Sequence, residues 1–328
     1  MKTKRYSFIL EAMQPIAHHS GTLGNVSLFM RRKVHDGKGN FEDVPFVTGD
    51  TMRHGMRDAS AIAYLDAAGL LDEKALGEAA TRLLFSGGMM TGKGDASKVD
   101  LARFTEMCTL CPPLGLLGGC VDNRSVPGRL FVDEATLICS ETERFIPDHA
   151  KEWLTAERVT IKSFREHMDE VTRVRMDPLL DPSKRGLLLP EAHVDVMRRL
   201  GAGERAHAAD DAVEKSDSKS TMMPRNFETL AQGSLFFWQA TCNCLDALEE
   251  DSFDVMVAAF LANCVVGGKK GTSHGRMRSI RAWNVDVRRP SDTVSDCVAL
   301  GKTTGSLFVE HVAKHKEQIR EWLRIVNA

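Results

Sequence analysis

The chain has 328 residues, of which 43% are hydrophobic, enough to bury the core of one large domain or two smaller ones. A formal net charge of −2 excludes nucleic-acid binding through bulk charge, so such binding requires a local basic patch. The eight cysteines lack the density of a secreted disulfide framework, and neither a signal-peptide pattern nor a membrane-spanning run is found. We therefore expect a cytoplasmic protein that does not enter a membrane.

The first predicted element is a strand over residues 5–13, whose hydrophobic residues alternate with polar ones. The polar turn that follows contains His18, His19 and Ser20. Adjacent histidines point in different directions on most backbones and therefore chelate a metal poorly. We interpret this turn as a loop near phosphate rather than a metal site.

A helix is predicted to start at Asp50 or Thr51, either of which can cap its first turn. Arg53 and Arg57 lie four residues apart on one face, with His54 beside them. The helix dipole and two guanidinium groups favour the same anion, so this helix start predicts a phosphate contact. The alternative is an exposed amphipathic helix in which Arg57 pairs with a carboxylate.

Three cysteines in the next segment are candidates for a metal site. Cys108 and Cys111 have the spacing of a zinc knuckle, and Cys120 follows nine residues later. Because no second pair and no nearby histidine complete four ligands, buried apolar thiols account for them better. We predict neither a bound metal nor a cofactor.

Residues 128–137, just beyond, are predicted to form one strand.

The middle of the chain predicts an inserted arm. Residues 159–185 are rich in charge, threonine and valine, which suits a protruding pair of strands. Residues 201–221 are small and polar, which is typical of a mobile tip. Met222, Met223 and Arg225 then return the chain to the core.

The most informative stretch runs from residue 263 to 287. Its five positive charges are opposed only by Asp286, and its four glycines allow positive φ and a close approach of the backbone to a ligand. The basic residues are Lys269, Lys270, Arg276, Arg278 and Arg281. This pattern predicts a polyanion site, with a solvated turn between a helix and a strand as the alternative. The chain is then predicted to end in a single amphipathic helix over residues 307–326.

The order of these elements describes an α+β core with an antiparallel sheet and helices on one face. The order of four segments makes the resemblance more specific. They are VPFVTGDTMRHGMRDA, CTLCPPLGLLGG followed by GRLFVDEA, FETLAQGSLFFW, and GGKKGTSHGRMRS. Together they resemble the RAMP superfamily of CRISPR effector proteins, and within it the Cas-seven-type backbone subunit of type IV complexes. The resemblance implies an RNA-recognition-motif or ferredoxin-like palm over residues 1–158 and 226–328. It also implies an inserted thumb over 159–225 with a mobile tip at about 201–221.

The resemblance further implies a guide-RNA-binding role. The residues expected to hold the RNA backbone are Arg53, His54, Arg57, Lys269, Lys270, Ser273, His274 and Arg276, and the turn of His18, His19 and Ser20 joins them. Met222 and Met223, with Arg225, would form a wedge against a flipped base, for which packing at the root of the arm is the alternative. The implied partners are guide RNA, complementary target DNA or RNA, further copies of the chain placed head to tail, and other effector subunits.

The resemblance departs from the family pattern at the position linked to catalysis. Type III relatives that cut RNA place an aspartate in the loop after the first strand, where this chain has Gly24 and Asn25. Asp36 comes only after the second predicted strand. We therefore expect a non-catalytic subunit. The alternatives are a metal-dependent ribonuclease subunit of a type III-like effector and a stand-alone RNA-binding protein.

Overall fold

The computed structural model describes residues 2–35, 39–73, 76–88, 101–121, 124–176, 222–286, 293–296 and 305–325, with isolated positions between 183 and 198. The chain divides into two compact units. The first comprises Met1–Ser20, Phe29–Asp169 and Thr229–Ala328, and the second comprises Gly21–Leu28 and Glu170–Glu228. Among the described residues, no helix is both long and apolar enough to cross a membrane.

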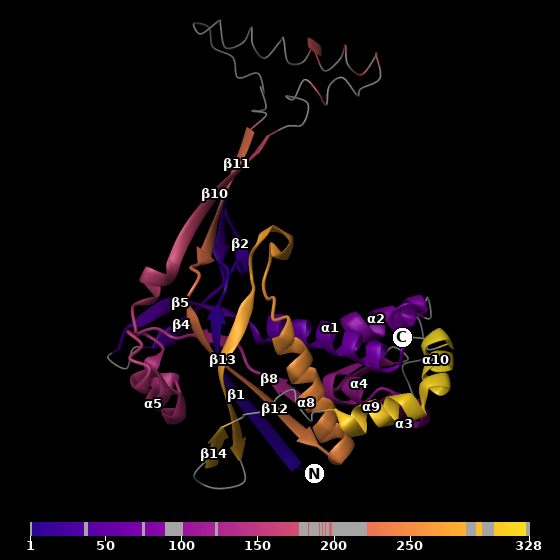
Figure 1. The fold of residues 1–328 in the computed structure, drawn as a ribbon. Coiled ribbons are helices and arrows are strands. Elements are labelled where there is room, and N and C mark those ends of the chain that lie inside the picture. Colours follow the sequence, from indigo (N-terminus) through magenta and orange to yellow (C-terminus); the bar gives the residue numbers. More distant parts are fainter. Residues whose placement is uncertain are drawn as a thin grey trace, which may run out of the picture. The chain divides into compact units, whose positions relative to one another are not determined.

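The first unit is built on a mainly antiparallel sheet with the strand order β14-β13-β1-β12-β9-β5-β4, to which β8 adds by pairing with β12 (Figure 1). The central strand β1 pairs antiparallel with β12 on one side and with β13 on the other. The strands are β1 (Lys2–Ala12), β4 (Arg31–His35), β5 (Phe41–Val47), β8 (Leu130–Val132), β9 (Ala135–Leu137), β12 (Leu235–Cys244), β13 (Met277–Asp286) and β14 (Thr293–Asp296).

The connections of this sheet are those of a ferredoxin-like fold. Helix α1 (Gly49–Ala67) lies in the chain between β1 and the short strands β8 and β9, and α8 (Ala247–Ala262) lies between β12 and β13. The spatial order β13-β1-β12-β9 therefore corresponds to a βαββαβ unit with its first and third strands in the middle. The predicted α+β class with an antiparallel sheet is confirmed.

Helices α1 and α8 cover one face of the sheet. Phe8 of β1 stacks on Trp238 of β12 with 5.2 Å between ring centroids, and Phe260 of α8 meets the same indole edge-on at 5.3 Å. Gly55 lets α1 approach α8 closely, because a Cβ there would lie 2.8 Å from the Phe260 ring. The helices that extend this layer are α2 (Glu78–Ser86), α3 (Leu101–Leu110), α4 (Pro112–Leu117), α9 (Ser306–Lys314) and α10 (Lys316–Ile325).

The other face of the sheet is covered in part by α5 (Asp148–Ala156), which stands apart from α1 and α8 in Figure 1. Ala150 and Leu154 of this helix pack with Ile9, Phe237 and Trp283 from three neighbouring strands. The alternation in the first strand predicted one buried face, whereas β1 is buried on both. Strand β1 therefore lies between two hydrophobic layers.

Two predicted elements are each interrupted in the structure. Residues 128–137 form β8 and β9 rather than one strand, because the pairing with β12 shifts by one residue between Val132, opposite Ala240, and Thr136, opposite Phe237. The predicted helix over 307–326 is divided at His315 into α9 and α10, and residue 326 lies outside the described part of the chain.

The remaining elements connect these layers. A hairpin of β6 (Gly118–Val121) and β7 (Arg124–Pro127) follows α4, and two short 3-10 helices, η1 (Glu143–Phe145) and η2 (Phe164–His167), flank α5. The strands associated with the second unit have the order β10-β11-β3-β2, and β11 pairs with β3 in parallel. They are β2 (His19–Leu23), β3 (Val26–Phe29), β10 (Met168–Met176) and β11 (Met222–Leu230). The predicted mobile tip over 201–221 lies outside the described residues.

Candidate nucleic-acid interface

The basic loop, residues 267–276, joins α8 to β13 through a series of left-handed turns. Gly267 and Gly275 have φ values of 75° and 91°, and Lys269 and Ser273 adopt φ values of 57° and 60° despite carrying side chains. The last two flank a single 3-10 turn, η4 (Lys270–Thr272). Left-handed residues of this kind are uncommon outside glycine and persist only where the surroundings enforce them.

The segment after β1 provides those surroundings. The N–H of Gly268 donates to the Ala17 carbonyl at 2.6 Å, and the N–H of Gly275 donates to the Pro15 carbonyl at 2.9 Å. A Cβ on Gly267 would lie 2.3 Å from the Ala17 oxygen, and one on Gly275 would lie 2.1 Å from the Val266 oxygen. Glycine is therefore required at both ends of the basic loop.

The predicted loop residues differ in how they are displayed. Lys270, Ser273 and Arg276 are exposed and Lys269 is half-buried. His274 is buried, and its Nδ1 lies 2.7 Å from the Thr272 carbonyl, so the imidazole donates inside the loop. His274 therefore shapes the basic loop, while the two lysines and Arg276 form its charged surface.

Two further cations of the stretch have local partners on β13. The Arg278 Nε donates to Glu11 at 2.7 Å, and the Arg281 guanidinium lies 5.5 Å from the centroid of the Trp283 ring. Both contacts are made on strands of the sheet, outside the basic loop. The charge of the loop itself therefore lies at residues 269–276.

His18 links the basic loop to the start of α1. Its Nε2 accepts from the backbone N–H of Thr48 at 3.4 Å, and its ring meets Phe29 edge-on at 6.2 Å. Burial, with a smaller contribution from His19, lowers the pKa of His18. His18 is thus held as a neutral acceptor, whereas His19 is half-buried and Ser20 is exposed at the start of β2.

Helix α1 is capped near the predicted position, but its arginines donate to backbone carbonyls of the protein. The N-cap is Thr48, whose Oγ1 accepts from the N–H of Thr51, rather than Asp50 or Thr51. Arg53 donates to the carbonyls of Leu130 at 2.7 Å and of Leu117. The Arg53 guanidinium therefore joins α1 to the ends of α4 and β8, and burial lowers its pKa.

Arg57 lies deeper. It is 8% exposed and donates to the Gly118 carbonyl at 2.9 Å, and more weakly to those of Leu83 and Leu117. Burial and the neighbouring Arg53 lower its pKa to about 10. The prediction that Arg57 displays its charge to phosphate does not fit this placement, because interior carbonyls occupy the guanidinium. His54 is exposed and lies 3.5 Å from Asp58.

The predicted base wedge is described only in its backbone. Met222, Met223 and Arg225 belong to β11, and their side chains lie outside the described atoms. The wedge therefore stays a prediction.

Of the three candidate metal cysteines, Cys108 belongs to α3, Cys111 directly precedes α4 and Cys120 belongs to β6. Cys111 and Cys120 are buried and Cys108 is half-buried. Burial raises the pKa of Cys108 to about 11 and that of Cys111 to about 12, which keeps both thiols protonated. Among the described residues, no group of three or more His, Cys, Asp or Glu side chains could hold a metal ion.

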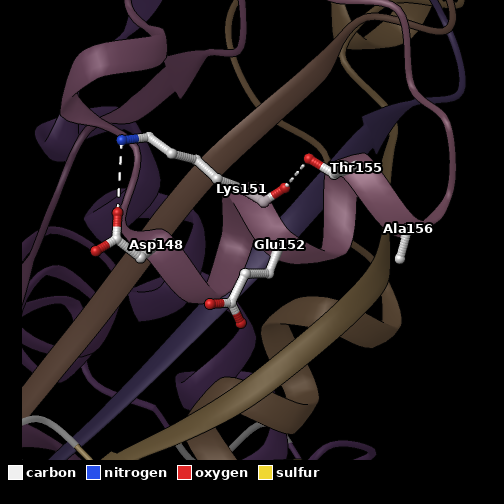
Figure 2. A pocket seen from close by; sticks show the side chains of 5 residues that line it. All are labelled: Asp148, Lys151, Glu152, Thr155 and Ala156. Atoms are coloured by element: carbon white, nitrogen blue, oxygen red, sulfur yellow. Dashed lines mark hydrogen bonds and ion pairs between the residues drawn. The ribbon is translucent and has the colours of Figure 1, made fainter.

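Two hollows that described residues line were not predicted from the sequence. Figure 2 shows the shallower one, of about 530 Å³, on the outer side of α5, where Lys151 Nζ lies 3.7 Å from Asp148 Oδ1 and its carbonyl accepts from Thr155. The second, of about 680 Å³, lies over β4, β9 and β12 and is lined in part by Asp133 and Glu134. The break between β8 and β9 places these two carboxylates there. The single strand that the sequence predicted over residues 128–137 gave no sign of this arrangement.

No protein-family model matches the sequence, and no curated protein matches it. A comparison with solved structures finds a similar fold in a chain of a structure titled "Type IV-B CRISPR Complex". The two chains are 16% identical in sequence with a TM-score of 0.50, and the alignment covers 91% of this chain and 93% of the other. At this identity the match establishes a shared fold over nearly the whole length of both chains.

Proposed function

We propose that this chain is a guide-RNA-binding backbone subunit of a CRISPR effector complex of the type IV kind. The observation that carries the proposal is the basic loop, which is fixed in a left-handed conformation against residues 15–17 and presents Lys270 and Arg276 to solvent. The fold shared with a chain of a type IV-B complex supports the same assignment. A cytoplasmic location and a role in defence against viruses or plasmids belong to this proposal.

The basic loop can bind an RNA backbone through charge and shape together. Lys269, Lys270 and Arg276 supply positive charge, and the left-handed backbone around η4 is of the kind that turns amide groups toward an anion. Phosphate contacts position a strand without specifying its sequence, so one subunit can hold any guide. His54, exposed on the first turns of α1, is a further contact, whereas Arg53 and Arg57 maintain the scaffold behind it.

We also propose that the subunit does not cleave its target. Residues 13–35, which include the loop after the first strand, contain no aspartate or glutamate. A general base or metal ligand of that type is thus missing from the segment that carries it in cleaving relatives. In a complex assembled on guide RNA, target RNA supplied with Mg²⁺ should remain intact, and cuts at regular intervals would favour the ribonuclease alternative.

The test of RNA binding uses fluorescence anisotropy with a labelled single-stranded RNA across a salt series. Lys269→Ala plus Lys270→Ala should weaken binding and reduce the slope of log K against log salt by about 1 to 2, because each lost phosphate contact removes about 0.7 from the slope on single strands.

The matched control is Lys314→Ala plus Arg324→Ala, which removes the same charge from exposed positions on α9 and α10. The control should lose little affinity and keep the slope. An equal loss in both double variants would show that RNA responds to total charge, and it would overturn the assignment of the basic loop.

A further inference from the structure

Two histidines lie against each other where the last two helices join. His311 belongs to the last turn of α9, and His315 is the residue between α9 and α10. Their ring centroids are 4.4 Å apart, with an angle of 38° between the ring planes. Both side chains are half-buried, so solvent reaches the pair. A spacing of four residues on a helix thus brings two imidazoles together on one side of it.

Hydrogen bonds determine which nitrogen of each ring carries the proton. His311 Nε2 lies 2.6 Å from the carbonyl oxygen of Thr109 in α3, and His315 Nδ1 lies 2.8 Å from the carbonyl oxygen of His311. A carbonyl oxygen only accepts, so both of these nitrogens donate. In the neutral rings the lone pairs are therefore on His311 Nδ1 and His315 Nε2. Within the described part of the chain, no hydrogen bond occupies either of them.

This arrangement is the one in which histidines bind metals. A metal-ligating histidine usually donates its other ring N–H to a carboxylate or a backbone carbonyl, which fixes the tautomer and the ring. Both His311 and His315 already donate to carbonyls. Metal–nitrogen bonds of about 2.0–2.1 Å place two ligand nitrogens of one ion about 3 Å apart. Two rings with centroids 4.4 Å apart can reach that separation by rotation of the side chains.

We propose that His311 and His315 together bind one divalent transition-metal ion of the kind that prefers imidazole, such as Zn²⁺ or Ni²⁺. Among the described residues, no group of three or more His, Cys, Asp or Glu could hold a metal ion, so water molecules complete the coordination. The inference concerns the helical layer and does not depend on the proposed RNA-binding function.

An ion at this pair stabilises the joint between the two helices. His315 marks the end of α9, and the hydrogen bond from His311 to Thr109 ties the same joint to α3, which lies beside α9 in Figure 1. Trp322 and Leu323 of α10 belong to one hydrophobic cluster with buried residues of α3. A ligand that binds only the folded joint therefore favours the packing of α9 and α10 on this layer.

The test is a calorimetric titration of the full-length protein, freed of metal by dialysis against EDTA, with Ni²⁺. The parent should bind one ion at this site, and His311→Gln and His315→Gln should each weaken that binding by about tenfold or more, because a single imidazole cannot chelate. Ni²⁺ should also raise the midpoint of thermal unfolding of the parent and leave that of either variant unchanged. His35→Gln, which removes a half-buried histidine of β4, is the matched control and should behave as the parent in both measurements.

The outcomes either support or overturn the site. His315→Gln removes only a hydrogen bond within the joint, so a folded variant is expected even if His311→Gln fails to fold. Loss of binding in His315→Gln supports the site. Undiminished binding in His315→Gln shows that the ion is held elsewhere, and the absence of saturable binding to the parent shows that the two rings only stack; either result overturns the inference. Lys269→Ala plus Lys270→Ala should bind Ni²⁺ as the parent does, so the RNA-binding proposal is decided separately.

Discussion

Arg57 shows how a cation that resembles a ligand-binding residue in sequence can serve the interior. Arg57→Ala should destabilise the protein by about 2–4 kcal/mol, because up to three buried carbonyls lose a charged donor. Urea unfolding measures the loss, and Arg324→Ala on the surface of α10 should stay within about 0.5 kcal/mol of the parent. A folded Arg57→Ala protein with normal stability but without RNA binding would instead place the guanidinium on the RNA.

His18 gives the stability a pH dependence of predictable sign. Its pKa in the folded protein lies below the ordinary value of 6.5, so the unfolded chain binds the proton first. Its contribution to the free energy of unfolding is therefore complete above pH 6.5 and is lost as the pH falls below that value.

The measurement for His18 is urea unfolding between pH 8 and pH 5 on the parent and on His18→Gln. The difference between the two free energies should shrink as the pH falls, because the variant has no imidazole to protonate. Burial also lowers the pKa of His167, but that group is present in both proteins and cancels. A difference that is constant over the whole range would show that His18 does not titrate as described.

At the scale of single residues, the sequence indicated the glycines of the basic loop, whereas it gave no sign of the carbonyl contacts that Arg53 and Arg57 make. The glycines at 267 and 275 could be predicted because positive φ and close backbone contact leave few alternatives. The roles of Arg53 and Arg57 depend on carbonyls of residues 83–130, which come together only in the folded chain. Nothing in the local pattern distinguishes such an arginine from one that binds phosphate.

The basic loop acts as one element, and its geometry can be tested separately from its charge. Gly275→Ala should weaken RNA binding and stability together, because its Cβ would lie 2.1 Å from the Val266 oxygen at a φ of 91°. Gly271→Ala has open space around its Cβ and should be nearly neutral in both measurements. Anisotropy and thermal unfolding on the two variants provide the comparison, and equal behaviour of both would mean that the loop conformation does not matter for binding.

Strands with a clear local sequence pattern were predicted well, whereas the positions at which a predicted element is interrupted were not. The alternation of β1 and the glycine-rich entry into β13 are local signals. The break between β8 and β9 depends on how both strands pair with β12, which is distant in the sequence, and the hollow beside it depends on that break. The hollow was therefore beyond sequence reasoning for the same reason as the two short strands.

For the whole molecule, the proposed backbone role predicts that RNA length sets the size of the assembly. Light scattering after gel filtration should give a mass that rises stepwise as the single-stranded RNA is lengthened, because a head-to-tail interface has no closed end of its own. Lys269→Ala plus Lys270→Ala should shift the particles toward free protein at the same concentrations. A single mass for all RNA lengths would favour the stand-alone RNA-binding alternative.

The position of β1 also bears on how the protein is made. Residues 2–12 emerge from the ribosome long before the strands with which they pair, β12 and β13, as in Lys2 with Cys244. The sheet therefore cannot close until more than two hundred further residues have been synthesised, and contacts this distant in sequence form slowly. Until then β1, whose central residues are buried in the folded protein, stays uncovered, so production in a cell should gain from chaperones that cover this strand.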